Sequence, residues 1–472
     1  MLVVPEGAVW PSPLWNDELS ATRYHCDLAY LGAGSATAAS DVAVTVEDGR
    51  FVAVEPGVAR TADAAHLRGL TLPGFANAHS HAFHRVLRGR AERPGTFWTW
   101  RDEMYTVAAV LDPALYHRLA RAVFAEMVLA GFSAVGEFHY LHHGPGGTPY
   151  DDPNEMGRVL VVAAADAGIR ITVLDTCYLT GGPGTPPEGV QQRFCDGDVG
   201  RWAERAEALA SVTAPGRALV GAAAHSLRAV APGDAGAVAS WALGHDVPFH
   251  VHVSEQRAEN DTVRHAYGAA PVDLLDSVGA LGRSTTVVHA THLHPAAISA
   301  LGRSGTAVCM CPTTERALGD GIGKASTLAR EGSPIVLGTD SHAVIDPFEE
   351  MRALELDDRL ATGERGRFET AALLDAATTG AHASIGWHDA GRITPGAPAD
   401  LVTVSLSSVR LAGATPDTLV EHVVFGAGPP DVTDVVVSGR RVVEDGRHLL
   451  LGDVAAELSG AIAEVVRAAA RA

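Results

Sequence analysis

The sequence predicts an α/β fold, a (β/α)8 TIM-like barrel with a small β-sandwich domain built from both chain ends. Three observations support this fold class. Apolar strand-like runs alternate with alanine-rich helical stretches through the middle of the chain, and there are eight such runs. The two ends instead carry short segments of alternating hydrophobicity, separated by turn residues. Eight buried strands with intervening helices are typical of a closed parallel barrel.

The small domain is predicted from residues 1–72 and 391–472. Residues 42–57 read VAVTVEDGRFVAVEPG, in which apolar and polar residues alternate on both sides of an Asp-Gly pair. That arrangement is a strong signal for a β-hairpin. Residues 391–446 return to the same style, so the two ends are expected to form halves of one β-domain. An alanine-rich helix is predicted at the end of the chain.

The barrel is predicted over residues 73–390. Its eight strands are expected within the runs 72–81, 131–143, 169–179, 218–230, 248–255, 285–294, 306–315 and 334–342. Most of these runs end in polar or ionisable residues. The C-terminal strand ends of such barrels carry the catalytic groups, so the functional residues are expected there.

The composition limits the classes of partner. The chain has 472 residues, of which 47% are hydrophobic and 19% charged, as in an ordinary globular enzyme. Its net charge of −20 disfavours binding to nucleic acid or to an anionic membrane. Any anionic substrate would need a local cationic clamp. The only lysine is Lys324, and the other basic residues besides histidine are arginines.

Cysteine usage and targeting signals favour a cytoplasmic enzyme. The five cysteines form no C-x-x-C pair, and reduced, buried thiols are expected. The N-terminal residues lack the basic start and apolar core of a signal peptide. No apolar run has the length needed to span a membrane. A homodimer is the expected assembly.

The first barrel run ends in the sequence His79-Ser80-His81. Residues two apart on a strand point to the same face, so both imidazoles are expected to face the barrel interior. Two imidazoles form half of a zinc-type site. An H-x-H pair alone is a weak signal, because short motifs often occur by chance.

Further ligand candidates stand at other strand ends. They are His250, His252 and Glu255 in PFHVHVSE, His289 in TTVVHATHLH, and Asp340 in VLGTDSH. Four strand ends together offer three histidines and an aspartate, with His250 and His252 as alternatives for the third histidine. Such nitrogen and oxygen donors suit a divalent zinc or iron ion.

These motifs, and the segment PGAPADLVTV at 395–404, resemble the amidohydrolase superfamily in its mononuclear, cytosine-deaminase-like branch. The resemblance implies one divalent metal per chain, most simply Zn²⁺ with Fe²⁺ as the alternative. Its implied ligands are His79, His81, His252 and Asp340. His252 is preferred to His250 because the branch has H-x-x-E spacing, which ends here at Glu255. Binuclear relatives use a lysine on strand four, whereas Lys324 follows strand seven, so one metal is expected.

The implied chemistry is hydrolytic deamination. A divalent ion would lower the pKa of a bound water. Glu255 is expected to move a proton from that water to the leaving nitrogen. Asp340 is expected to hold the water, and His289 to polarise the electrophile or stabilise the tetrahedral intermediate.

Three stretches predict the substrate class. FWTWRDEMY, read as part of a loop, contains Arg101; EFHYLHH contains Tyr140; AHSLRAV contains His225 and Arg228. Two arginines with Tyr and His donors suit a ligand with two carboxylates, since guanidinium groups bind carboxylates bidentately. The stretches are similar to those of family members that deaminate N-formimidoyl-L-glutamate in histidine degradation. The resemblance implies N-formyl-L-glutamate and ammonia as products.

One position departs from the family pattern. Those members have H-S-H-A-F-Q-R, whose Gln helps to bind the formimidoyl group, whereas this chain has His84 there. With an ordinary pKa near ~6.5, His84 would be protonated at low pH and repel a cationic formamidine. The alternatives are a deaminase of the same branch for another amidine or a nucleobase-like heterocycle, and a metal-free barrel that only binds a partner.

Overall fold

The computed structural model describes residues 21–32, 37–90, 92, 94–211, 213 and 216–471. The predictions made for residues 1–20 lie outside this range. The predicted barrel is confirmed: eight consecutive strands form one parallel sheet in the order β12-β11-β10-β9-β8-β7-β6-β5. They are β5 (Phe75–Ser80), β6 (Phe132–His139), β7 (Arg170–Cys177), β8 (Ala218–Ser226), β9 (Phe249–Val253), β10 (Thr285–His289), β11 (Ala307–Met310) and β12 (Ile335–Leu337).

The barrel closes between β12 and β5. The backbone N–H groups of Thr339 and Asp340 both donate to the His79 carbonyl, at 3.1 and 2.9 Å. The His81 N–H donates in turn to the Asp340 carbonyl at 3.1 Å. The first and last strand ends are thereby joined at the residues that the sequence predicts as ligands.

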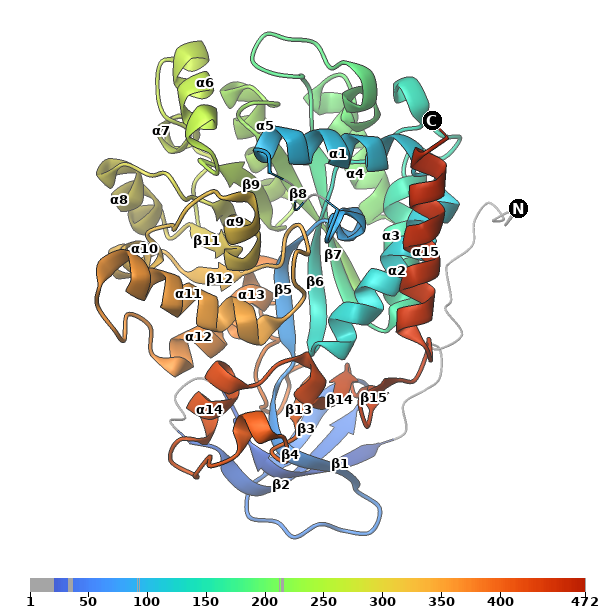
Figure 1. Cartoon of the computed structure of the whole chain (residues 1–472), viewed down its shortest axis with the longest axis vertical. Helices are drawn as coiled ribbons and strands as arrows, with labels where there is room; N and C mark the ends of the chain where they lie inside the picture. Colours follow the sequence, from blue (N-terminus) through green and yellow to red (C-terminus); the bar gives the residue numbers. More distant parts are fainter. Residues whose placement is uncertain are drawn as a thin grey trace.

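Helices surround the strands (Figure 1). The larger ones are α2 (Pro113–Leu129), α3 (Glu155–Ala167), α4 (Val199–Ala210), α5 (Pro232–Gly244), α6 (Arg257–Tyr267), α8 (Pro295–Ser304) and α11 (Pro347–Thr362). Local signals explain where they begin. In α2, Pro113 fits the first helical position, and the preceding Asp112 side chain accepts a hydrogen bond from the Leu115 N–H. Every residue of β6 and β7 is buried, as expected for strands enclosed by helices.

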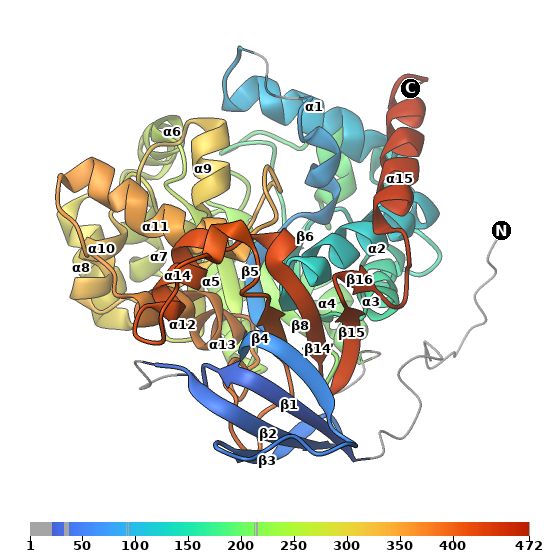
Figure 2. The same cartoon turned by 60° about the horizontal axis from the view of Figure 1, so that its bottom comes forward.

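Both chain ends contribute to a second sheet, in the order β16-β15-β14-β13-β4-β1-β2-β3 (Figure 2). Its strands are β1 (Thr22–Ala29), β2 (Ala39–Glu47), β3 (Arg50–Glu55), β4 (Ala65–Pro73), β13 (Leu401–Val404), β14 (Val432–Val437), β15 (Arg440–Glu444) and β16 (Arg447–His448). The two ends meet where β4 pairs antiparallel with β13. The sheet turns back on itself, because Phe51 N on β3 donates to Ala397 O at 3.0 Å, and an apolar core lies inside the turn.

A buried ion pair ties this sheet to the barrel. Arg170 at the start of β7 donates to both carboxylate oxygens of Asp400, and both side chains are almost fully buried. The Ser438 N–H also donates to Asp400 at 2.8 Å. Removing one member would leave a buried charge without its partner, which costs about 3–5 kcal/mol.

The C-terminal helix α15 (Val454–Ala469) lies along barrel helix α2. Arg118 and Arg121 of α2 pair with Glu464 and Glu457 of α15, at 2.9 and 2.5 Å. Apolar residues of α15 share the main core with α2. Among the described residues, no helix combines the length and apolarity needed to cross a bilayer.

One local prediction is wrong. The stretch FWTWRDEMY is not a loop but forms the start of helix α1 (Phe97–Val110), which lies above the strand ends in Figure 1. Thr96 and Thr99 form a capping box at its N-terminus. Aromatic and β-branched residues have low helix propensity, so the sequence carries no clear signal for this helix. Arg101 therefore projects from a regular element rather than from a loop.

Candidate active site

Four predicted ligands gather at the C-terminal end of the barrel. One ligand atom from each of His79, His81, His252 and Asp340 lies within 4.8 Å of the other three, and all four residues are buried. Asp340 Oδ1 is 3.4 Å from His79 Nε2 and 3.3 Å from His81 Nε2. The Nε2 atoms of His79 and His252 lie 3.0 Å apart.

The chemistry of these donors fits a divalent cation. The Nδ1 atoms of His81 and His252 face the carbonyls of Phe138 and His225, at 3.0 and 2.9 Å. Donation from Nδ1 leaves each Nε2 lone pair facing the cluster, the arrangement found in histidine ligands. Burial lowers the pKa of all three imidazoles well below the usual range, so they are neutral. Neutral imidazoles converging on a carboxylate are a zinc-type donor set.

His250 lies outside this cluster. Its Nε2 atom is 2.8 Å from the Ser384 carbonyl, so the ring faces the C-terminal end of helix α13 (Thr379–Ser384). His250 and His252 are both on β9. The placement favours His252 as the third histidine, in agreement with the H-x-x-E spacing.

Glu255 and His289 stand beside the cluster. His289 Nε2 lies 3.9 Å from Glu255 Oε1 and 3.9 Å from Asp340 Oδ2, while its Nδ1 lies 3.4 Å from Glu315 Oε1. Burial opposes the charged imidazolium, but Glu255, Glu315 and Asp340 together raise the pKa of His289 well above its ordinary value. Burial raises the pKa of Glu255 to about 7, opposed by His289 and Arg228. Glu255 is thus poised for proton transfer near neutrality.

The backbone at these strand ends is held in an unusual conformation. Ser254, His289, Ala290 and Asp340 have φ values of 54°, 69°, 50° and 45°. Non-glycine residues rarely adopt this left-handed region, and such strain gathers at functional sites. The strain is consistent with side chains aimed at one point.

A buried network that the sequence did not predict supports the His79-Ser80-His81 segment. Ser80 Oγ donates to Glu137 Oε2 at 2.5 Å, and the Ala82 N–H donates to Glu137 Oε1 at 2.7 Å. His342 Nε2 lies 3.1 Å from the same Ser80 hydroxyl. Burial raises the pKa of Glu137 to about 8, opposed by its hydrogen bonds to Ser80 and Ala82. Glu137 lies on β6, and no sequence motif links that strand to the His79-Ser80-His81 segment. Its supporting role is therefore visible only in the tertiary structure.

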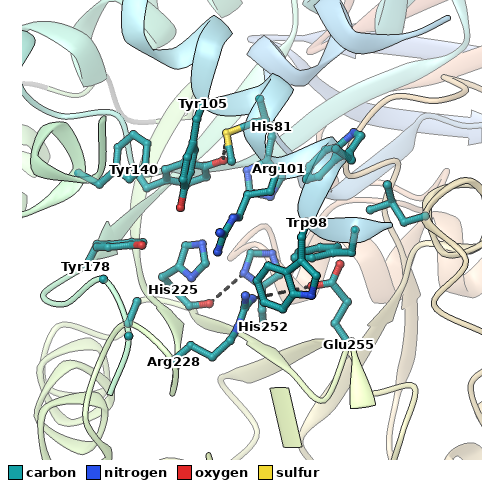
Figure 3. Close-up of a pocket in the computed structure, with 18 of the residues that line it drawn as sticks. His81, Trp98, Arg101, Tyr105, Tyr140, Tyr178, His225, Arg228, His252 and Glu255 are labelled. Atoms are coloured by element: carbon teal, nitrogen blue, oxygen red, sulfur yellow. Dashed lines mark hydrogen bonds and ion pairs between the residues drawn. The ribbon is translucent and has the colours of Figure 1, made fainter. Parts of the chain in front are cut away.

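All five predicted substrate-binding residues line one cavity together with Glu255 and three of the four cluster residues, His81, His252 and Asp340. The five are His84, Arg101, Tyr140, His225 and Arg228, of which Figure 3 labels all but His84. The Arg101 guanidinium lies over the rings of Trp98 and Tyr105, at 4.6 and 5.2 Å from their centroids. Arg228 Nη2 lies 4.0 Å from Glu255 Oε2. Within the described part of the chain, the buried Nε atoms of Arg101 and Arg228 have no hydrogen-bond partner.

His84 lies in surroundings unlike those of a histidine with the ordinary pKa expected from the sequence. It is 3% exposed, and its Nε2 is 2.8 Å from the Tyr140 hydroxyl. Burial lowers its pKa to about 3, although Asp340 raises it. The expectation of a charge change near pH 6.5 is therefore wrong. A neutral His84 remains a hydrogen-bonding group at the cavity wall.

The sequence reasoning missed several residues of the same cavity and its supports. They are Phe97, Trp98, Tyr105 and Tyr178 in the lining, and Gln191, Glu259 and Glu315 behind it. Tyr105 was not predicted because helix α1, on which it lies, was not recognised in the sequence. Gln191 lies in a long segment after β7 with no pattern of its own.

Comparison with known proteins places this site in a family. Residues 70–442 match the amidohydrolase family. The chain belongs to the amidohydrolase family. The predicted resemblance is thus confirmed.

This amidohydrolase is 38% identical to formimidoylglutamate deiminase from Pseudomonas aeruginosa, over 85% of this chain and 90% of that protein. It is 30% identical to 8-oxoguanine deaminase from the same organism, over 84% of this chain and 88% of that protein. A crystal structure of an amidohydrolase from Brucella melitensis superposes with a TM-score of 0.87 and 32% identity. That match covers 94% of this chain and all of the other.

Proposed function

We propose that this amidohydrolase hydrolyses N-formimidoyl-L-glutamate to N-formyl-L-glutamate and ammonia. The observation that carries the proposal is the presence of Arg101 and Arg228 in the same cavity as Glu255 and three of the four cluster residues. Among the described residues, no carboxylate lies within ion-pair distance of Arg101, whose charge is stacked on aromatic rings instead. A cation left without a carboxylate in a cleft is ready to bind one from a ligand.

We propose that His79, His81, His252 and Asp340 bind one Zn²⁺, which when bound supplies the positive charge that ionises a water at neutral pH. Glu255 then accepts the proton of that water and delivers it to the departing nitrogen. The His289 ring is oriented by Glu315, whose Oε1 lies 3.4 Å from its Nδ1. His289 donates a hydrogen bond to the substrate atom, attached to the reacting carbon, on which negative charge develops. Asp340 accepts a hydrogen bond from the attacking water.

The substrate's two carboxylates meet the arginines. Arg228 is the nearer arginine to the reacting groups, because it lies 4.0 Å from Glu255. Tyr140 and His225 line the cavity with it and supply polar groups. His84 contacts the substrate's formimidoyl end, in place of the glutamine of similar enzymes, and remains neutral.

Two alternatives are less well supported. A deaminase for a heterocyclic base would leave two partly buried guanidinium groups facing a neutral ring, which is unfavourable. A metal-free binding barrel would have no use for four intact ligand positions beside a proton-transfer carboxylate. The similarity to formimidoylglutamate deiminase also exceeds that to 8-oxoguanine deaminase, at 38% against 30% identity.

The direct test is ammonia release from N-formimidoyl-L-glutamate by the zinc-loaded protein, with guanine and cytosine assayed in parallel. The proposal requires turnover of the formimidoyl compound well above that of either base. Activity on a base alone would replace it with the heterocycle alternative. The predicted cytoplasmic location and homodimer remain predictions.

A further inference from the structure

We propose that Tyr105 and Tyr178 form a second carboxylate subsite with Arg101, and that Gln191 makes them hydrogen-bond donors toward it. The inference rests on the proposed function and deepens it, because it assigns this subsite to the substrate carboxylate farther from the reacting carbon. Tyr105 and Tyr178 line the cavity, whereas Gln191 stands behind them and acts as a positioning residue.

Gln191 binds both hydroxyl oxygens at once. It lies in the 3-10 helix η4 (Gly189–Phe194), and its Nε2 atom donates to Tyr105 Oη and to Tyr178 Oη, each at 3.1 Å. The Gly181 carbonyl is a third acceptor at 3.5 Å. The Glu188 N–H donates to Gln191 Oε1 at 3.1 Å. That contact fixes the orientation of the amide, since only its oxygen can accept from a backbone N–H.

The orientation of this amide determines what the tyrosines can offer a ligand. Each hydroxyl oxygen already accepts a hydrogen bond from Gln191, so each hydroxyl hydrogen must point elsewhere. Tyr105 and Tyr178 are also neighbours, and one hydroxyl can donate to the other. At least one O–H is then left for the cavity. Burial raises the pKa of Tyr178 above its ordinary value, so this hydroxyl keeps its proton.

The subsite lies on the side of Arg101 away from the reacting groups. Figure 3 shows Tyr105 and Tyr178 on the opposite side of the pocket from Glu255, with Arg101 between them. Tyr105 follows Arg101 by one turn of α1, and the guanidinium lies 5.2 Å from its ring centroid. Arg228 lies 4.0 Å from Glu255, although its charge also acts on Tyr178. The distal carboxylate of a bound dicarboxylate would reach the two tyrosines.

A carboxylate is the ligand chemistry that this subsite recognises. The subsite presents the Arg101 guanidinium and the tyrosine hydroxyl donors, whose direction is determined by their hydrogen bonds with Gln191. An ionised carboxylate accepts several hydrogen bonds and carries the balancing charge, whereas an apolar end would leave the donors unpaired.

The test is Gln191→Glu, which keeps the shape and the acceptor for the Glu188 N–H but removes the N–H donors. Its carboxylate would accept the tyrosine hydroxyl hydrogens and draw them away from the cavity. The matched control is Gln192→Glu, which adds the same charge at an exposed neighbouring position. Three substrates are compared by kcat/KM: N-formimidoyl-L-glutamate, N-formimidoyl-4-aminobutyrate, which keeps only the distal carboxylate, and N-formimidoyl-L-norvaline, which lacks it.

We expect Gln191→Glu to lower kcat/KM about ten- to a hundredfold for the two substrates with a distal carboxylate, mostly through KM. For the norvaline compound, kcat/KM should change less than about threefold, which is well below the effect of losing one hydrogen bond to a charged group. Tyr178→Phe should show the same selectivity in weaker form, and Gln192→Glu should match wild type.

Each of the other possible outcomes contradicts a specific part of the proposal. An equal loss on all three substrates would make Gln191 a structural residue only. A loss confined to glutamate and norvaline compounds would assign the subsite to the other carboxylate. A wild-type protein inactive on N-formimidoyl-L-glutamate would refute the proposed function itself. An active wild type with an unaffected Gln191→Glu variant would refute this inference alone.

Discussion

Ser80, the residue between two proposed metal ligands, donates a 2.5 Å hydrogen bond to the buried carboxylate of Glu137. Glu137 also accepts a hydrogen bond from the Ala82 N–H, so it holds the chain on both sides of His81. Glu137→Ala would free this segment and should lower zinc affinity about ten- to a hundredfold, the usual cost of losing a group that supports metal ligands. Competition with a chelating dye measures it. Glu444→Ala, at a half-exposed position, is the control, and equal affinities would refute the support role.

His250 and His252 provide a matched pair on one strand. His252→Ala should lose the metal, because it removes a neutral imidazole aimed at the cluster. His250→Ala should retain one metal per chain, since its ring faces the Ser384 carbonyl instead. Elemental analysis after gel filtration gives the metal content of both. Two tightly bound ions in the wild type would contradict a mononuclear site, and metal loss from His250→Ala would reverse the ligand choice.

Glu255→Gln should keep the metal and lose turnover. The amide has nearly the same shape but cannot carry a proton, and proton transfer contributes at least about 10²-fold to such rates. The measurement is kcat on N-formimidoyl-L-glutamate, alongside metal content and a thermal melt. A metal-loaded variant with a near-normal rate would remove Glu255 from the mechanism.

Arg101→Met and Arg228→Met should each weaken use of the dicarboxylate substrate. A ligand carboxylate would then be buried without its charged partner, at a cost of about 3–5 kcal/mol in kcat/KM. Arg264→Met, at an exposed position on α6, should have no effect. A variant of either cavity arginine with wild-type kcat/KM would show that this arginine does not bind the substrate.

His84→Gln should leave the acid limb of the pH profile in place. The pKa of His84 is lowered to about 3 by burial, so the folded protein keeps it neutral between pH 5 and pH 8. The unfolded chain binds a proton there below about 6.5, so the stabilisation from neutral His84 is present above that pH and lost as pH falls toward 3. Profiles of kcat/KM from pH 5 to 8 should superimpose in shape. An acid limb that disappears in His84→Gln would mean that His84 titrates near neutrality in the active protein.

The barrel and the cluster of candidate metal ligands were predictable because both depend on local signals. Parallel strands enclosed by helices appear as continuous apolar runs, and ligands at their ends appear as His and Asp beside those runs. Arg101 was placed in the right cavity but on the wrong element, because the aromatic start of α1 has weak helix propensity. Gln191, Glu137 and Glu315 were not predictable. Their roles come from contacts between segments far apart in the chain, which leave no periodic pattern.

The closure of the barrel has a consequence for how the protein is made. Asn77 and Thr339, 262 residues apart, exchange two hydrogen bonds at 2.7 and 3.0 Å across the junction of β5 and β12. His79 and Asp340 lie beside this junction, so the ligand set is divided between an early and a late part of the polypeptide. A nascent chain still being translated through its middle would hold at most three of the four ligands. If these four residues bind the proposed metal ion, all four could do so only after the ribosome has delivered β12 and Asp340, and metal uptake would then report completion of the barrel.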